Sequence, residues 1–149
     1  MLFLIFLLLV NLSFALNCQE LGIRLERVKT YNIYDELVQY AEGLLKNCQE
    51  NESYPLALDY LLNALETIYQ DKTKADSRLV KRVADQRTKN SLLMLRKTSK
   101  YKKKYPLLYS YQQLFHVVAV ENRRVGDYEY ALKYAYASTQ IGKAILQLK

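Results

Sequence analysis

Apolar side chains recur every three or four residues along most of the chain, which is the spacing of amphipathic helices. In residues 19–29, for example, Leu21, Leu25 and Val28 follow this rhythm. The pattern predicts seven helices, over about residues 19–29, 34–48, 55–69, 77–87, 91–105, 107–124 and 128–149. Because the chain has only 4 glycines and 2 prolines, it lacks the turn residues that many-stranded sheets need. We expect an all-α fold.

Local signals mark where these helices begin and end. Pro55 falls in the first turn of the third segment, where its missing N–H costs nothing. Asp76, or the serine after it, can cap the fourth segment. Pro106 interrupts the fifth, residues 125–127 (Val-Gly-Asp) are a clear turn, and residues 88–90 (Thr-Lys-Asn) are a weaker break.

The first sixteen residues carry no charged side chain and only two polar ones, Asn11 and Ser13. This run is short for a membrane span, which needs about 20 apolar residues. Ser13 and Ala15 place small residues where a signal peptidase reads the chain, which predicts a signal peptide over residues 1–15 and one mature domain over 16–149. We expect a periplasmic or secreted protein. Because no Lys or Arg precedes the apolar run, the alternative is an uncleaved segment that tethers the protein.

Cys18 and Cys48 are the only two cysteines. In an oxidising compartment such a pair favours a disulfide, and two free buried thiols are the alternative. Each cysteine lies about fifteen residues from the turn at 31–33, one before it and one after. If the first two helices are antiparallel, their far ends meet and bring the two thiols together. We therefore predict a Cys18–Cys48 disulfide.

Charge is distributed unevenly along the chain. Residues 16–71 carry a net charge of −6, residues 72–105 carry +11, and residues 106–149 carry +2. The densest basic cluster, interleaved with tyrosines, is Arg96, Lys97, Lys100, Lys102, Lys103 and Lys104. For an exported protein this cluster favours an anionic membrane or envelope surface over nucleic acid. A solvated helix face is the alternative, and the acidic part of one copy could also dock on the basic part of another.

Two segments of the chain resemble each other. A tyrosine followed by small and apolar residues at helical spacing occurs as Tyr54, Ala57, Leu58, Leu61 and Ala64, and again as Tyr128, Ala131, Leu132, Ala135 and Ser138. This pattern resembles the second helix of the tetratricopeptide repeat (TPR). The resemblance implies about three TPR-like hairpins, stacked as a short right-handed solenoid after an N-terminal helix. The middle hairpin, residues 77–105, matches the pattern poorly, and an irregular helical bundle is the alternative.

The resemblance also implies a scaffold that binds another protein or a peptide along the first helices of the hairpins. Carried over position by position, its groove residues are Gln39, Glu42, Lys46, Lys81, Arg87, Gln113, His116, Val120 and Arg123. Two of them have plainer interpretations. His116 also fits a surface or half-buried histidine, and Arg123 fits a charge that stabilises a helix C-terminus.

Residue types that commonly carry catalysis are scarce. His116 is the only histidine, and the chain has no Gly-rich phosphate loop, no HExxH motif and no nucleophile elbow. We expect a protein that is not an enzyme and binds no metal or cofactor.

The last predicted helix has two distinct faces. One is a ridge of small residues that we expect to press against the preceding helix, namely Ala131, Ala135, Ser138 and Gly142. The other is an apolar stripe of Ile141, Ile145 and Leu148. Because no capping helix follows, we expect part of this stripe to be exposed and to contact a second subunit or another protein.

Overall fold

The computed structural model describes residues 18–70 and 75–149, and within these residues the chain is helical and has no strand. An N-terminal helix covers residues 18–29. It is followed by α2 (Asp35–Lys46), α3 (Ser53–Tyr69), α4 (Ser77–Thr98), the short 3-10 helix η1 (Ser99–Tyr101), α5 (Pro106–Arg124) and α6 (Tyr128–Leu148). The all-α prediction is confirmed. The predicted signal peptide, residues 1–15, lies outside the described residues.

The helix α4 is continuous over 22 residues, so the predicted break at residues 88–90 is wrong. The Thr88 hydroxyl donates to the carbonyl of Ala84 at 2.7 Å, and the Asn90 side chain accepts a hydrogen bond from Gln86 at 3.2 Å. These polar side chains bond within the helix instead of ending it. The prediction of a middle TPR-like hairpin over residues 77–105 is therefore also wrong, because one long helix, α4, lies where two helices were expected.

Other predicted boundaries are confirmed. The Asp76 carboxylate caps α4 by accepting a hydrogen bond from the backbone N–H of Arg78 at 2.7 Å. Pro106 begins α5. Between α5 and α6, Gly126 has φ +87°, a conformation that side chains with a Cβ rarely adopt.

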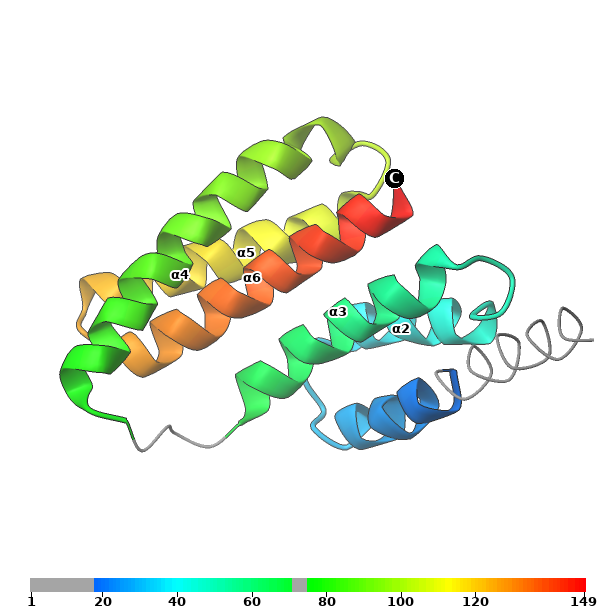
Figure 1. Cartoon of the computed structure of the whole chain (residues 1–149), viewed down its shortest axis with the longest axis horizontal. Coiled ribbons are helices and arrows are strands. Elements are labelled where there is room, and N and C mark those ends of the chain that lie inside the picture. The colour runs from blue at the N-terminus through cyan, green and yellow to red at the C-terminus, as the bar shows by residue number, and fades with distance from the viewer. Residues whose placement is uncertain (1–17, 71–74) are drawn as a thin grey trace, which may run out of the picture.

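The centre of the molecule is α6, which packs against α3, α4 and α5 (Figure 1). Figure 1 shows α3 running antiparallel to α6, while α4 runs parallel to it. Ile141 and Ile145 are fully buried in the same core cluster as Leu58 and Leu61 of α3, and Leu148 is half-buried. Part of the stripe was expected to be exposed. This is wrong for Ile141 and Ile145, because α3 packs along them, whereas Leu148 at the end of the stripe stays partly exposed. That stripe gives no support to self-association.

Small side chains let α6 approach its neighbours closely. A Cβ atom added at Gly142 would lie 2.2 Å from Met94 Cγ of α4 and 2.7 Å from Gln112 Nε2 of α5. The Ser138 hydroxyl donates to the backbone carbonyl of Gln112 at 2.7 Å. The predicted close approach of the last helix to α5 is confirmed, and it extends to α4.

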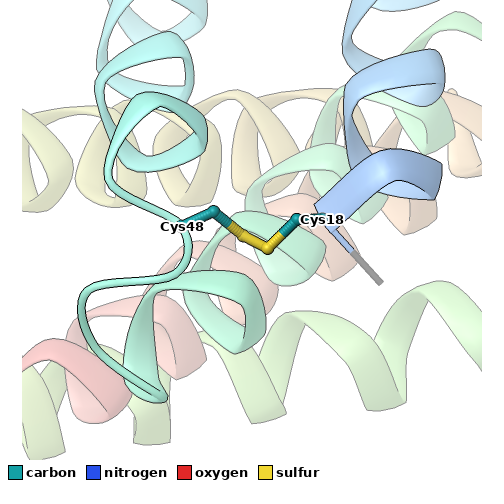
Figure 2. The surroundings of a disulfide bond; sticks show 2 residues. All are labelled: Cys18 and Cys48. Carbon is teal, nitrogen blue, oxygen red and sulfur yellow. A yellow bond between two sulfur atoms is a disulfide. The ribbon is translucent and has the colours of Figure 1, made fainter. Parts of the chain in front are cut away.

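The N-terminal helix is joined to both α2 and α3. A disulfide links Cys18 at its start to Cys48 just beyond α2, with a Cα–Cα distance of 6.1 Å (Figure 2). This pairing is the one that the sequence predicts. On the side facing α3, the Arg24 guanidinium donates to the carboxylates of Asp59 and Glu66, each at 2.5 Å. The helix is thus held by one covalent bond and one network of ion pairs.

Candidate functional site

Two adjoining cavities lie between α4 and α6. The first, of ≈ 420 Å³, lies at the end of α3 and has an apolar wall formed by Leu79, Val80, Val83 and Leu132. The second, of ≈ 210 Å³, is polar and includes Asn90, Thr139, Gln140 and Lys143. Arg87 and Tyr136 line both cavities. Together the two cavities form one groove, which we name the α4–α6 groove.

Helical spacing builds this groove. Leu79, Val83 and Arg87 are four residues apart and therefore share one face of α4. On α6, Leu132 and Tyr136 are likewise four residues apart. Because α4 and α6 run in the same direction (Figure 1), the groove is apolar near the first turns of both helices and becomes polar and basic farther along.

The charge at the middle of the groove comes from Arg87, which is half-buried. Its guanidinium donates to the carbonyl of Leu132 at 3.4 Å and lies over the ring of Tyr136, 4.9 Å from the ring centre. Burial lowers the pKa of Arg87. Among residues 18–70 and 75–149, no carboxylate lies within ion-pairing distance of this guanidinium. A partly desolvated cation without an ion pair favours an anionic ligand.

The two lysines of the groove differ in their availability. Lys133 is only 6% exposed, donates to the carbonyl of Gln70 and lies 3.8 Å from a Glu129 oxygen. It therefore holds the end of α3 against α6. Lys143 lies over the ring of Tyr60, 5.9 Å from its centre, and forms no ion pair within the described parts of the chain. Arg87 and Lys143 are thus the cations that a ligand in the groove would meet.

Of the nine groove residues that the TPR resemblance implied, the structure places only Arg87 in the α4–α6 groove. Gln39 and Glu42 line a separate cavity of ≈ 160 Å³ beside the N-terminal helix, where Glu42 pairs with Lys29 at 3.2 Å. Lys46 is exposed at the end of α2. These side chains of α2 are therefore not brought together with Arg87.

The remaining predicted groove residues lie on α4 and α5. Lys81 sits over the ring of Tyr128, 5.7 Å from its centre. Gln113 and Val120 are exposed on α5, and Arg123 pairs with Asp85 of α4 at 2.6 Å. Of these, Arg123 already has an anionic partner within the chain.

His116 joins α5 to α4. Its Nδ1 lies 2.6 Å from the Ser91 hydroxyl oxygen, and that hydroxyl also donates to the carbonyl of Thr88 at 2.8 Å. Because Ser91 has one hydroxyl hydrogen, this pattern assigns the histidine Nδ1–H as the donor to Ser91. Burial lowers the pKa of His116. Since Ser91 is fully buried, the pair holds two helices together and does not present a nucleophile to a substrate.

The predicted anionic-surface cluster lies at the C-terminal end of α4 and beyond it. Arg96 and Lys97 belong to the last turn of α4, and Lys100 to η1. Lys102, Lys103 and Lys104 follow before α5. All six side chains are exposed, and Lys104 lies 5.5 Å from the ring centre of Tyr105.

Sequence reasoning did not identify most of the α4–α6 groove. The sequence pattern assigned no binding role to Leu79, Val83, Tyr136 or Lys143. The helical spacing within each pair, four residues on α4 and seven on α6, was the available signal. It defines a face of one helix but does not identify the helix that lies opposite. The pairing of α4 with α6 supplies that information.

Comparison with protein-family models, with curated proteins and with solved structures finds no match to this chain. No helix within the described residues is long and apolar enough to span a bilayer.

Proposed function

We propose that this protein is an exported, non-enzymatic interaction module whose α4–α6 groove binds a segment of a partner protein. The segment presents an apolar side chain next to a carboxylate. The observation that carries this proposal is Arg87, a half-buried cation that adjoins an apolar cavity of ≈ 420 Å³. Among the described residues it forms no ion pair, and Glu129 acts on it only as a more distant charge.

The proposed ligand follows from the two ends of the groove. The apolar wall of Leu79, Val83 and Leu132 suits a branched or aromatic side chain, and pockets of this size are typical of specific recognition. A carboxylate beside it would accept charge-assisted hydrogen bonds from Arg87, whose planar guanidinium can bind both oxygens. Lys143 adds a second positive charge at the polar end.

The TPR-like interpretation is retained for two hairpins only. The repeated tyrosine and small-residue pattern lies on α3 and α6, the second helices of hairpins α2–α3 and α5–α6. We propose that these two hairpins are TPR-like units and that α4 replaces the unit between them. The right-handed solenoid remains a prediction.

Selection of peptides from a random phage-displayed library tests the groove. We expect selected peptides to combine an apolar residue with Asp or Glu. Loss of a charge-assisted hydrogen bond costs about 1.5–3 kcal/mol, so Arg87→Gln should weaken their binding by at least about tenfold. Leu79→Gln, at an exposed position of the apolar wall, should also weaken it.

The matched control is Lys81→Gln, which removes one exposed cation from the same helix outside the groove. It should leave peptide binding unchanged. Two results would contradict the proposed groove. One is a set of selected peptides without acidic residues, and the other is equal binding by wild type and Arg87→Gln.

Export is a separate part of the proposal. The Cys18–Cys48 disulfide supports it, because such bonds persist in oxidising compartments. N-terminal sequencing of the protein isolated from its native host should read from residue 16. A chain that still begins at Met1 would favour the tethered form instead.

A further inference from the structure

The solvent-facing side of α4 carries a second basic surface, separate from the groove. Its cations, Arg78, Arg82, Lys89 and Arg96, are spaced by four, seven and seven residues, which places them on one face of the helix. All four are exposed. Between the last two lie Leu92 and Leu93, which are 41% and 52% exposed. We name these six residues the α4 outer face.

No carboxylate among the described residues pairs with these cations. Residues 75–149 contain sixteen basic and only five acidic side chains. Each acidic side chain already has a local role. Asp76 and Asp127 cap α4 and α6, while Asp85, Glu121 and Glu129 lie beside Arg123, Arg124 and Lys133. The described residues therefore do not neutralise the positive charge of the α4 outer face, which can bind an anionic partner.

The neighbouring helix α5 extends the apolar part of this surface. Two contacts fix its register against α4, Asp85 with Arg123 and Ser91 with His116. Leu92 directly follows Ser91, and Val117 directly follows His116, so both lie at the same level of the antiparallel pair. Val117 is 50% exposed. Exposed apolar side chains of two helices thus lie at one level, with cations along α4 on both sides of that level.

We propose that the α4 outer face docks on an anionic lipid bilayer. In this arrangement the cations contact lipid headgroups, and Leu92, Leu93 and Val117 enter the boundary between headgroups and acyl chains. The complementary charge favours an anionic partner. The exposed leucines favour a bilayer over a soluble polyanion, because a polyanion in water offers no apolar layer that would cover them. This inference does not depend on the groove.

Flotation with lipid vesicles tests the docking. We expect the full chain to bind phosphatidylcholine vesicles that contain about one third phosphatidylglycerol, to ignore pure phosphatidylcholine, and to dissociate at high salt. Each basic side chain near an anionic surface strengthens binding about fivefold. The triple variant Arg82→Gln/Lys89→Gln/Arg96→Gln should therefore bind about a hundredfold more weakly.

Two further variants complete the test. Leu92→Gln/Leu93→Gln changes only exposed side chains and keeps the charge, and it should weaken vesicle binding about tenfold. The control Arg27→Gln/Lys46→Gln/Lys149→Gln removes three exposed cations from other surfaces and should bind like wild type. Circular dichroism should show unchanged helix content in all three variants.

Three results would overturn the proposal. The first is the absence of binding to phosphatidylglycerol vesicles at low salt. The second is equal weakening by the control variant, which would indicate nonspecific attraction by net charge. The third is full binding by the leucine variant together with loss in the Arg82/Lys89/Arg96 variant, which would favour a soluble polyanion or an acidic protein as the partner.

Discussion

Replacing Gly142 with alanine tests how closely α6 packs between α4 and α5. The new Cβ atom would lie 2.2 Å from Met94 Cγ and 2.7 Å from Gln112 Nε2, whereas carbon atoms in contact normally stay about 3.5–4.0 Å apart. Gln112 is fully buried, so it can move only by displacing other core side chains. The side chains of Met94 and Gln112 must therefore shift.

The magnitude follows from two opposing effects. Alanine is favoured over glycine within a helix by about 0.8–1 kcal/mol. Extra volume in a packed core costs about 1–3 kcal/mol, and the two short contacts at Gly142 place the cost in the upper half of that range. We expect Gly142→Ala to lower the free energy of unfolding by about 1–2 kcal/mol.

The matched control is Gly43→Ala on α2, where an added Cβ meets no atom within 4 Å. This variant keeps the helix-propensity gain without the clash and should raise the free energy of unfolding by about 0.5–1 kcal/mol. Urea unfolding followed by circular dichroism measures both changes. A Gly142→Ala variant as stable as wild type, or more stable, would refute the close packing of α6.

Two further predictions concern stability. Because the Cys18–Cys48 disulfide closes a loop of 30 residues, its replacement by two serines should lower the free energy of unfolding by about 3–4 kcal/mol; unchanged urea unfolding without reductant would contradict this. Burial lowers the pKa of His116, so the unfolded chain takes up this proton first as the pH falls. Stability should decline from about pH 6.5 downwards, and less steeply in His116→Gln. Identical pH profiles of unfolding for wild type and His116→Gln would contradict the assignment of this pH dependence to His116.

Helix positions were predictable because they depend on local chemistry. The apolar spacing, the Asp76 cap and the Gly126 turn each act within a few residues. The wrong prediction of a helix break at residues 88–90 also has a local cause. Thr88 and Asn90 are poor helix formers on average, yet in α4 their side chains bond to Ala84 and Gln86 within the same helix. Averages over many helices do not reveal such individual bonds.

The central place of α6 depended on tertiary structure, although a signal for it existed. Residues 134–142 contain no charged side chain, and a helix that is uncharged on all sides is usually buried. Part of the apolar stripe of Ile141, Ile145 and Leu148 was instead expected at the surface, because repeat proteins usually cover that face with a capping helix and none was predicted. The helix that covers this stripe, α3, ends at Tyr69, about 70 residues before Ile141, and reaches it only through folding.

The sequence alone determined the helical class, most helix boundaries and the disulfide, because periodicity, caps and cysteine spacing act along the chain. The tertiary structure decided which faces pair. It placed Arg87 beside Leu132 and Tyr136 of α6, and it left Leu92, Leu93 and the α4 cations exposed. Periodicity defines a face of a helix, but only packing decides whether that face becomes core, groove or surface. Both proposed binding surfaces arise from that second step.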